Sequence, residues 1–147
     1  MLRFYLSALI TATALTVPVL CAAADSAPLI AVVVGRESFV THVSRDELRE
    51  LYLRRQRLWP NGIRAIPINL PPDHLARERF STLVLGRSPR ELVSYWNARY
   101  FEGITPPSVL PSSAAIRTYL NAEPAAIAYL PLAEVDDTCR MLLVLEH

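Results

Sequence analysis

Residues 29–35 read LIAVVVG, and this stretch decides the fold of the chain. It is a short apolar run, rich in the β-branched residues Val and Ile, and it ends at a glycine. Such a run is typical of a strand that is buried within a sheet. Residues 125–130 (AAIAYL) and 140–145 (RMLLVL) predict two further short strands of the same apolar kind.

Two capping boxes predict where helices begin. In residues 44–47 (SRDE) and 88–91 (SPRE), a serine precedes a glutamate by three residues, the pair that caps a helix N-terminus. The first box predicts a helix from Arg45 that ends before the turn cluster WPNG at residues 59–62. The second box predicts a helix that ends near Gly103.

The helix after the second box is expected to pack on the core. Its apolar side chains at helical spacing are Leu92, Val93, Trp96 and Tyr100. This spacing favours a core position for Trp96. The turn residue Trp59 fits a core position and a contact position about equally well.

The middle of the chain predicts a strand, a loop and a helix. Residues 64–70 (RAIPINL) predict the strand, and Pro67 favours an edge or irregular position for it. Asp73 is a good N-cap for a helix that runs to Leu85 and stops at Gly86.

A last helix completes the pattern. It follows a proline-rich link at residues 105–111 and is capped by Ser112 or Ser113. The resulting order is β-α-β-α-α-α-β-β. This order predicts an α/β fold in which a mixed sheet is flanked by helices.

The first 24 residues predict a secretory signal peptide. Arg3 precedes an apolar run, and Ala22–Ala24 supplies the small residues that a cleavage site needs. We expect cleavage after Ala24, one domain over residues 25–147, a periplasmic or secreted bacterial protein, and membrane contact only during export. An uncleaved anchor is the alternative reading. Lipidation of Cys21 is disfavoured because the preceding Leu20 is not small.

Composition excludes some functions. The mature chain would hold 123 residues (147 − 24), with 14 basic residues (15 − 1) and 14 acidic ones, so its formal net charge is zero. A general nucleic-acid binder would show a basic excess. Cys139 would be the single remaining cysteine, which leaves no intramolecular disulfide and favours a buried small hydrophobic side chain.

The sequence lacks the common catalytic and metal motifs. It contains no G-x-S-x-G, H-E-x-x-H, G-x-x-x-x-G-K or C-x-x-C segment. Its histidines are far apart, and the pair Asp136–Asp137 is typical of a solvated turn. We therefore expect no enzyme activity, no cofactor and no metal.

Two places offer groups for an anion. The segment 69–80 (NLPPDHLARERF) joins a strand end to a helix start, where free N–H groups favour anions. Its candidate ligand-binding residues are Asn69, His74 and Arg77, although Asp73 in the same loop would repel an anion and fits a simple capping role. Arg54, Arg55 and Arg57 fit an anion site, or a helix end whose dipole they complement.

Several segments, taken in order, resemble a known family. They are SRDELRELYLRRQRLWPNG, IPINLP, ARERFSTLVLGRSPRELVSYWNARYFEG and EPAAIAYLP, and together they span most of residues 29–145. They resemble short phosphate ABC-transporter substrate-binding-like proteins, which are similar to one lobe of the larger periplasmic phosphate-binding proteins. The residues at the positions of the family pattern are Leu51, Tyr52, Leu53, Arg54, Trp59, Asn61, Gly62, Phe80, Trp96, Phe101, Gly103, Ile127, Ala128 and Tyr129.

The resemblance implies one lobe of a type-2 periplasmic-binding-protein-like fold. It also implies a phosphate or related oxyanion ligand and, as partner, an ABC-transporter permease or another envelope protein. The chain departs from the family at residues 70–76 (LPPDHLA), where the larger proteins have Gly, Ser and Thr, and at Ala126 and Ala128, where they have glycines.

Two functions therefore stay open. The first is a solute-binding-like protein for phosphate, which would bind weakly as one open lobe unless two chains pair. The second is a non-catalytic scaffold or interaction protein that has kept the fold and lost the ligand site.

Overall fold

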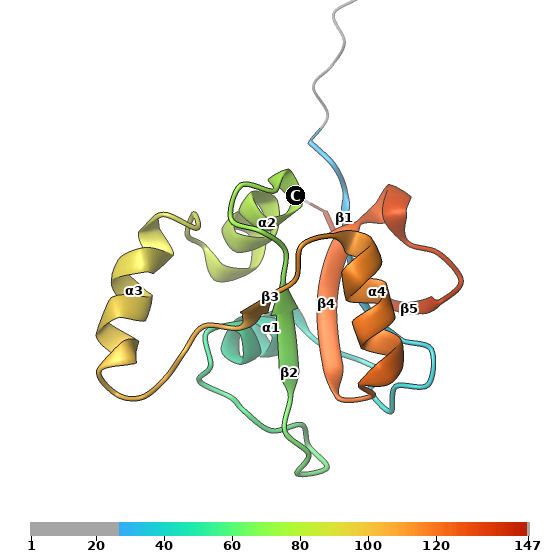
Figure 1. Ribbon diagram of the computed structural model, residues 1–147, viewed down its shortest axis with the longest axis horizontal. Helices are drawn as coiled ribbons and strands as arrows, with labels where there is room; N and C mark the ends of the chain where they lie inside the picture. Colours follow the sequence, from blue (N-terminus) through green and yellow to red (C-terminus); the bar gives the residue numbers. More distant parts are fainter. Residues whose placement is uncertain (1–26, 147) are drawn as a thin grey trace, which may run out of the picture.

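The predicted strand at residues 29–35 lies inside the sheet as β1 (Ile30–Gly35). In the computed structural model, which describes residues 27–146, five strands form one sheet in the order β3 (Ser108–Val109), β2 (Ile66–Asn69), β4 (Ala126–Pro131), β1 and β5 (Cys139–Leu145) (Figure 1). β1 pairs antiparallel with β4 (Ala126–Pro131) on one side and with β5 (Cys139–Leu145) on the other. Every residue of β1 and β4 is buried, as the apolar runs predict.

The other half of the sheet is parallel. β2 (Ile66–Asn69) pairs with β4, and the two-residue strand β3 (Ser108–Val109) pairs with β2. The sequence predicts a link here and misses β3, because two residues are too short to show a periodic pattern. β3 reaches only Ile68 and Asn69, so Pro67 has no strand beside it on that side. This irregular position suits a residue without an N–H.

Helices cover both faces of the sheet. α4 (Ser113–Ala122) packs over β1 and β4, while α1 (Arg45–Tyr52) and α2 (Leu75–Phe80) lie on the opposite face (Figure 1). The predicted caps are present at both longer helices. The Glu47 N–H donates to Ser44 Oγ at 3.1 Å, and the Ala115 N–H donates to Ser112 Oγ at 3.2 Å.

The helix predicted from Asp73 to Leu85 is shorter and begins later. His74 caps α2, because its Nδ1 accepts the Ala76 N–H at 3.1 Å, and Asp73 takes no part in the cap. A π-helical turn, Ser81–Leu85, follows α2 and stops at Gly86 in the left-handed conformation, as predicted. An aspartate and a histidine can both accept at an N-cap, so composition alone could not choose between adjacent positions.

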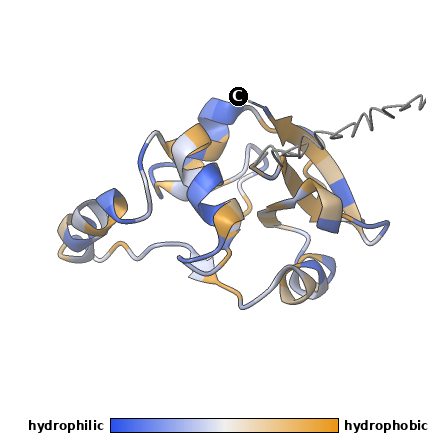
Figure 2. Ribbon diagram, turned by 90° about the horizontal axis from the view of Figure 1, so that it is seen from above, coloured by the Kyte–Doolittle hydropathy of each residue, from blue (hydrophilic) through white to orange (hydrophobic). Residues whose placement is uncertain are grey.

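Of the four apolar positions predicted to pack on the core from α3 (Glu91–Tyr100), only Leu92 is buried, which corrects the interpretation of α3 as a core helix. The predicted capping box at its start is present: the Ser88 N–H donates to the Glu91 carboxylate, and the Glu91 N–H donates to the Ser88 hydroxyl. However, Val93 and Tyr100 are 56% and 69% exposed, and Trp96 is only half-buried. Figure 2 shows α3 set apart from the sheet and its other helices. Helical spacing identifies an apolar stripe but not what covers it.

Trp59 belongs to the core. It is buried, and its indole Nε1 donates to the Ala125 carbonyl at 2.9 Å, which fixes the turn after α1 against the start of β4. Cys139, the first residue of β5, is half-buried. The sequence predicted a buried side chain here, and the structure shows one that is only partly buried. This partial burial raises the pKa of the thiol.

An aromatic cluster fills the space between β4 and the helices α1 and α2. Phe80 stacks on Tyr129 with ring centroids 3.9 Å apart, and Tyr52 lies 4.6 Å from Phe80. The Tyr52 hydroxyl donates to the Ile68 carbonyl at 2.9 Å, and the Tyr129 hydroxyl donates to Asn69 Oδ1 at 3.0 Å. Both tyrosines are thus buried with their polar ends satisfied.

The predicted signal peptide at residues 1–24 lies outside the described residues, so cleavage after Ala24 stays a prediction. Within residues 27–146, no helix combines the length and the apolar character needed to cross a bilayer.

Replacing Gly35 by alanine should strongly destabilise the protein. A Cβ at this position would lie 2.0 Å from the Leu120 carbonyl oxygen in α4, so the helix would have to move away from β1. We expect the free energy of unfolding to fall by about 3 kcal/mol, the upper part of the usual range for overpacked sites. Urea denaturation measures the change.

Gly62→Ala is the control for this substitution. Its Cβ would meet open space, but its φ of +82° is left-handed, so the expected loss is only about 1–2 kcal/mol. Equal losses for the two variants would contradict the close contact between β1 and α4.

Stability should fall at high pH because of the two buried tyrosines. Burial raises the pKa of both Tyr52 and Tyr129 above the ordinary value near 10. Between the unfolded pKa and the raised folded pKa, only the unfolded chain releases these protons, so stability is lost as pH rises above about 10. Tyr129→Phe should reduce the slope by about 1.4 kcal/mol per pH unit.

Urea denaturation at pH 9 to 11 measures that slope. Tyr100→Phe is the matched control, because Tyr100 is largely exposed and should leave the slope unchanged. A Tyr129→Phe variant with the wild-type slope would contradict the burial of the Tyr129 hydroxyl.

Candidate functional site

The three predicted ligand-binding residues lie on the connection between β2 and α2. Asn69 is the last residue of β2, His74 caps α2, and Arg77 lies in the first turn of α2. The loop between them, residues 70–73, is tied together by the His74 N–H, which donates to the Pro71 carbonyl at 3.0 Å. The fold therefore places all three residues around one short loop.

Asn69 is buried, and a tyrosine of the aromatic cluster holds its side chain in place. Its Oδ1 accepts from the Tyr129 hydroxyl, and its backbone carbonyl accepts the Leu110 N–H at 2.9 Å. With the Tyr129 hydroxyl donating to Oδ1, Nδ2 is the remaining donor of the Asn69 amide. Tyr129 belongs to the predicted strand AAIAYL and to the family pattern, and its contact with Asn69 was not predicted from the sequence.

One ring nitrogen of His74 accepts a hydrogen bond from the backbone, and the other is available to a ligand. Its Nδ1 accepts the Ala76 N–H, so in the neutral ring the hydrogen is carried on Nε2. The residue is half-buried. His74 can therefore cap the helix and present an N–H donor at the same time.

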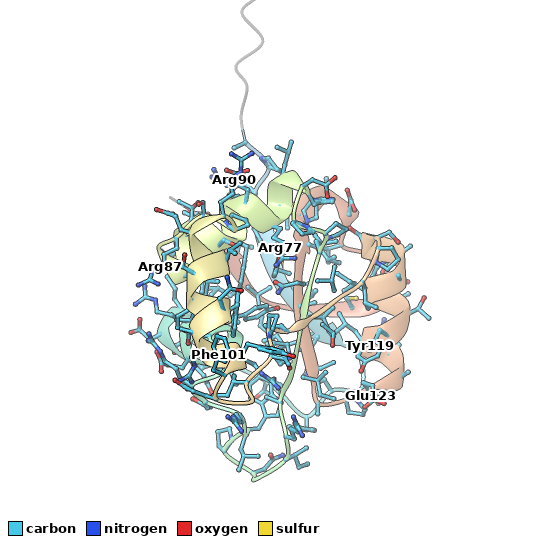
Figure 3. The ribbon with its side chains drawn as sticks, turned by 60° about the vertical axis from the view of Figure 1, so that its left-hand side comes forward. Arg77, Arg87, Arg90, Phe101, Tyr119 and Glu123 are labelled. Carbon is cyan, nitrogen blue, oxygen red and sulfur yellow. The ribbon has the colours of Figure 1, made fainter. Side chains whose placement is uncertain are left out.

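Arg77 reaches back over the loop from α2. Its Nη1 donates to the Leu70 carbonyl at 2.7 Å, and the side chain is half-buried (Figure 3). None of the ion pairs within residues 27–146 includes Arg77. One end of its planar fork is thus fixed, and its positive charge has no carboxylate partner in that part of the chain.

The loop also carries an opposing charge. Asp73 is exposed beside His74. Since exposed charges are screened by water and salt, its repulsion of a bound anion is weaker than that of a buried carboxylate. The site is therefore a basic, hydrogen-bond-donating loop with one acidic neighbour at its surface.

The described residues offer little for metal binding. Within residues 27–146, no group of three or more His, Cys, Asp or Glu side chains comes together. Asp136 forms an ion pair with Arg117 at 3.0 Å and accepts the Thr138 N–H, as expected for a solvated turn. The β2–α2 connection carries the N–H donors of His74 and Arg77 next to the carboxylate of Asp73.

Comparisons with known proteins agree with the sequence resemblance at the level of the fold. No family model matches the sequence, and no curated protein matches it. An ABC-type phosphate transport receptor from Vibrio cholerae matches with a TM-score of 0.63 and 18% identity, over 78% of this chain and 45% of the receptor chain.

Two further solved structures are similar over the same share of this chain. A putative phosphate ABC transporter substrate-binding protein with bound phosphate from Clostridium perfringens has a TM-score of 0.63, 16% identity and 44% of its own chain covered. PstS from Borrelia burgdorferi has a TM-score of 0.59, 12% identity and 46% covered. The chain thus spans less than half the length of these proteins, and it is similar in fold to one part of the phosphate ABC-transporter binding proteins.

Proposed function

We propose that the chain is a solute-binding-like protein of the periplasm, which binds phosphate or a related oxyanion on the β2–α2 connection and serves an ABC transporter. The observation that carries the proposal is the loop held between Asn69 and Arg77, in a fold that is similar to one part of a protein with bound phosphate. Asn69 Nδ2, His74 Nε2 and the Arg77 guanidinium are the donors.

The arrangement suits an oxyanion because its donors are already positioned. The aromatic cluster orients Asn69, the helix cap orients His74, and the Leu70 carbonyl orients Arg77. Fixed donors lose little side-chain entropy when they bind a ligand. A guanidinium adds charge-assisted hydrogen bonds, which are about twice as strong as neutral ones.

Binding by one chain should be weak. A ligand on this loop faces water on its outer side, and water weakens each electrostatic interaction compared with a closed site. A second chain facing the loop would exclude that water and raise the affinity. Size-exclusion chromatography at several protein concentrations, with and without phosphate, distinguishes a monomer from such a pair.

Arg77→Ala should weaken phosphate binding about tenfold or more, because it removes a charge-assisted hydrogen bond. Isothermal titration of phosphate at low ionic strength measures the affinity. Arg79→Ala is the matched control, since Arg79 lies on the same helix, is also half-buried and carries the same charge. Absence of heat and of a thermal shift at millimolar phosphate would refute the proposal.

The exposed side of α3 favours a second candidate function, an interaction protein without catalytic activity. Val93, Tyr100 and Phe101 are all more than half exposed, and Phe101, directly after α3, reaches 89% (Figure 3). Tyr100 and Phe101 lie side by side, with ring centroids 6.2 Å apart, and exposed apolar side chains that form a contiguous patch mark interaction sites.

The double variant Tyr100→Ser/Phe101→Ser tests this second function. It should leave the free energy of unfolding nearly unchanged, because both side chains are already in solvent. It should also abolish the capture of an envelope protein by the immobilised wild-type chain. Capture that is identical for the two chains would remove α3 as the interaction site.

A further inference from the structure

A second basic hollow lies at the start of β2, away from α2. Its volume is about 250 Å³, and three segments line it: Arg54 after α1, residues 64–67, and residues 105–108. β2 and β3 run parallel, so residues 64–67 and 105–108 lie at the same end of the two strands. This end is opposite to the β2–α2 connection, which follows Asn69 (Figure 1).

Arg54 occupies a backbone position that normally favours glycine. Its φ is +59°, in the left-handed region directly after α1, where most helices that end this way carry glycine or asparagine. An arginine here stores backbone strain, and such strain concentrates at functional sites. Its guanidinium Nε is also buried without a hydrogen-bond partner within residues 27–146, a feature that Arg79, Arg99 and Arg140 share.

The positive charge around the hollow has no compensation in the described part of the chain. Arg55 pairs with Glu50 at 3.2 Å, but none of the ion pairs within residues 27–146 includes Arg54, Arg57 or Arg64. Burial, followed by the charges of Arg64 and Arg57, lowers the pKa of Arg54. The three guanidinium groups therefore repel one another. Arg57 and Arg64 are exposed, so water and salt screen part of this repulsion, and an anion between Arg54 and Arg64 would relieve the rest.

We propose that Arg54 and Arg64 form a second anion site, which takes the phosphoryl group of a small phosphate monoester. Two guanidinium groups match a phosphate monoester better than a carboxylate, because the monoester carries close to two negative charges at neutral pH and accepts bidentate hydrogen bonds. This site does not depend on the β2–α2 site.

The remaining lining agrees with this ligand class. Thr105 and Ser108 add hydroxyl groups, while Pro106 and Pro107 form an apolar wall for the organic part of the ester. The hollow is smaller than the roughly 300–1,000 Å³ of pockets for drug-sized ligands, which restricts it to a small compound. Arg57 is not part of the lining and contributes only its charge.

Titration of the full ¹⁵N-labelled chain with phenyl phosphate tests the proposal by NMR. The Nε–Hε signals of Arg54 and Arg64 should shift and saturate, while benzoate, which has one negative charge, should bind at least several-fold more weakly. Arg64→Gln should weaken phenyl phosphate binding about tenfold or more. Arg55→Gln, a control in the same arginine segment, should leave it unchanged, because Arg55 is paired with Glu50.

Arg54→Gly keeps the proposal testable if another variant fails to fold. Glycine adopts the φ of +59° without strain, so this variant should unfold at a urea midpoint no lower than that of the wild type. It should nevertheless lose the phenyl phosphate response at Arg64. Retained binding in a folded Arg54→Gly variant would overturn the site.

The experiment can refute either anion site without refuting the other. Binding that survives Arg64→Gln and is lost in Arg77→Ala belongs to the β2–α2 connection and overturns the second site. Binding that survives Arg77→Ala and is lost in Arg64→Gln supports the second site, whatever the outcome for the first. The absence of a saturable shift at Arg54 and Arg64 also overturns it.

Discussion

Burial of β1 and β4 on both faces is the constraint on which the rest of the structure depends. All twelve residues of the two six-residue strands are buried, so helices must cover each face. α4 approaches β1 so closely that Gly35 has no room for a Cβ beside the Leu120 carbonyl. On the other face, the Tyr52, Phe80 and Tyr129 rings fill the layer under α1 and α2. Apolar burial on this scale supplies the dominant favourable term in folding.

The same constraint shapes the β2–α2 connection. Tyr129 packs its ring in the aromatic cluster, and its hydroxyl donates a hydrogen bond to Asn69 at the end of β2. A buried hydroxyl needs a partner, and Tyr129 finds it in the Asn69 side chain, so a core residue is bonded to the last residue of β2. Arg77, from α2, donates a hydrogen bond to the Leu70 carbonyl and so links the helix to the loop. The loop is thus held by side chains of the core and of α2, without the glycines and hydroxyl residues that the family pattern has at this point.

Sequence patterns predicted the parts of the fold that depend on local chemistry. The apolar runs at β1, β4 and β5 and the boxes at Ser44 and Ser88 were sufficient, because burial and capping act over a few residues. The patterns failed where distant contacts decide. Trp96 lies on an apolar stripe that is buried only at Leu92, and β3 exists only because β2 lies beside it. The pairing of Tyr129 with Asn69 joins residues 60 positions apart. Similarly, Arg54 and Arg64 come together only through the turn that Trp59 fixes.

The arginines at the two ends of β2 differ in their hydrogen bonding, and this difference bears on where an anion would bind. At the α2 end, Arg77 is bonded to the Leu70 carbonyl, so its charge is oriented and partly satisfied without a ligand. At the opposite end, Arg54 has a strained backbone and a buried Nε without a partner in the described chain. A cluster of like charges that lowers stability persists only if it is offset elsewhere or serves a ligand. Around the hollow, Arg54 is therefore the arginine whose buried Nε an anion would satisfy, whereas Arg77 is already hydrogen-bonded.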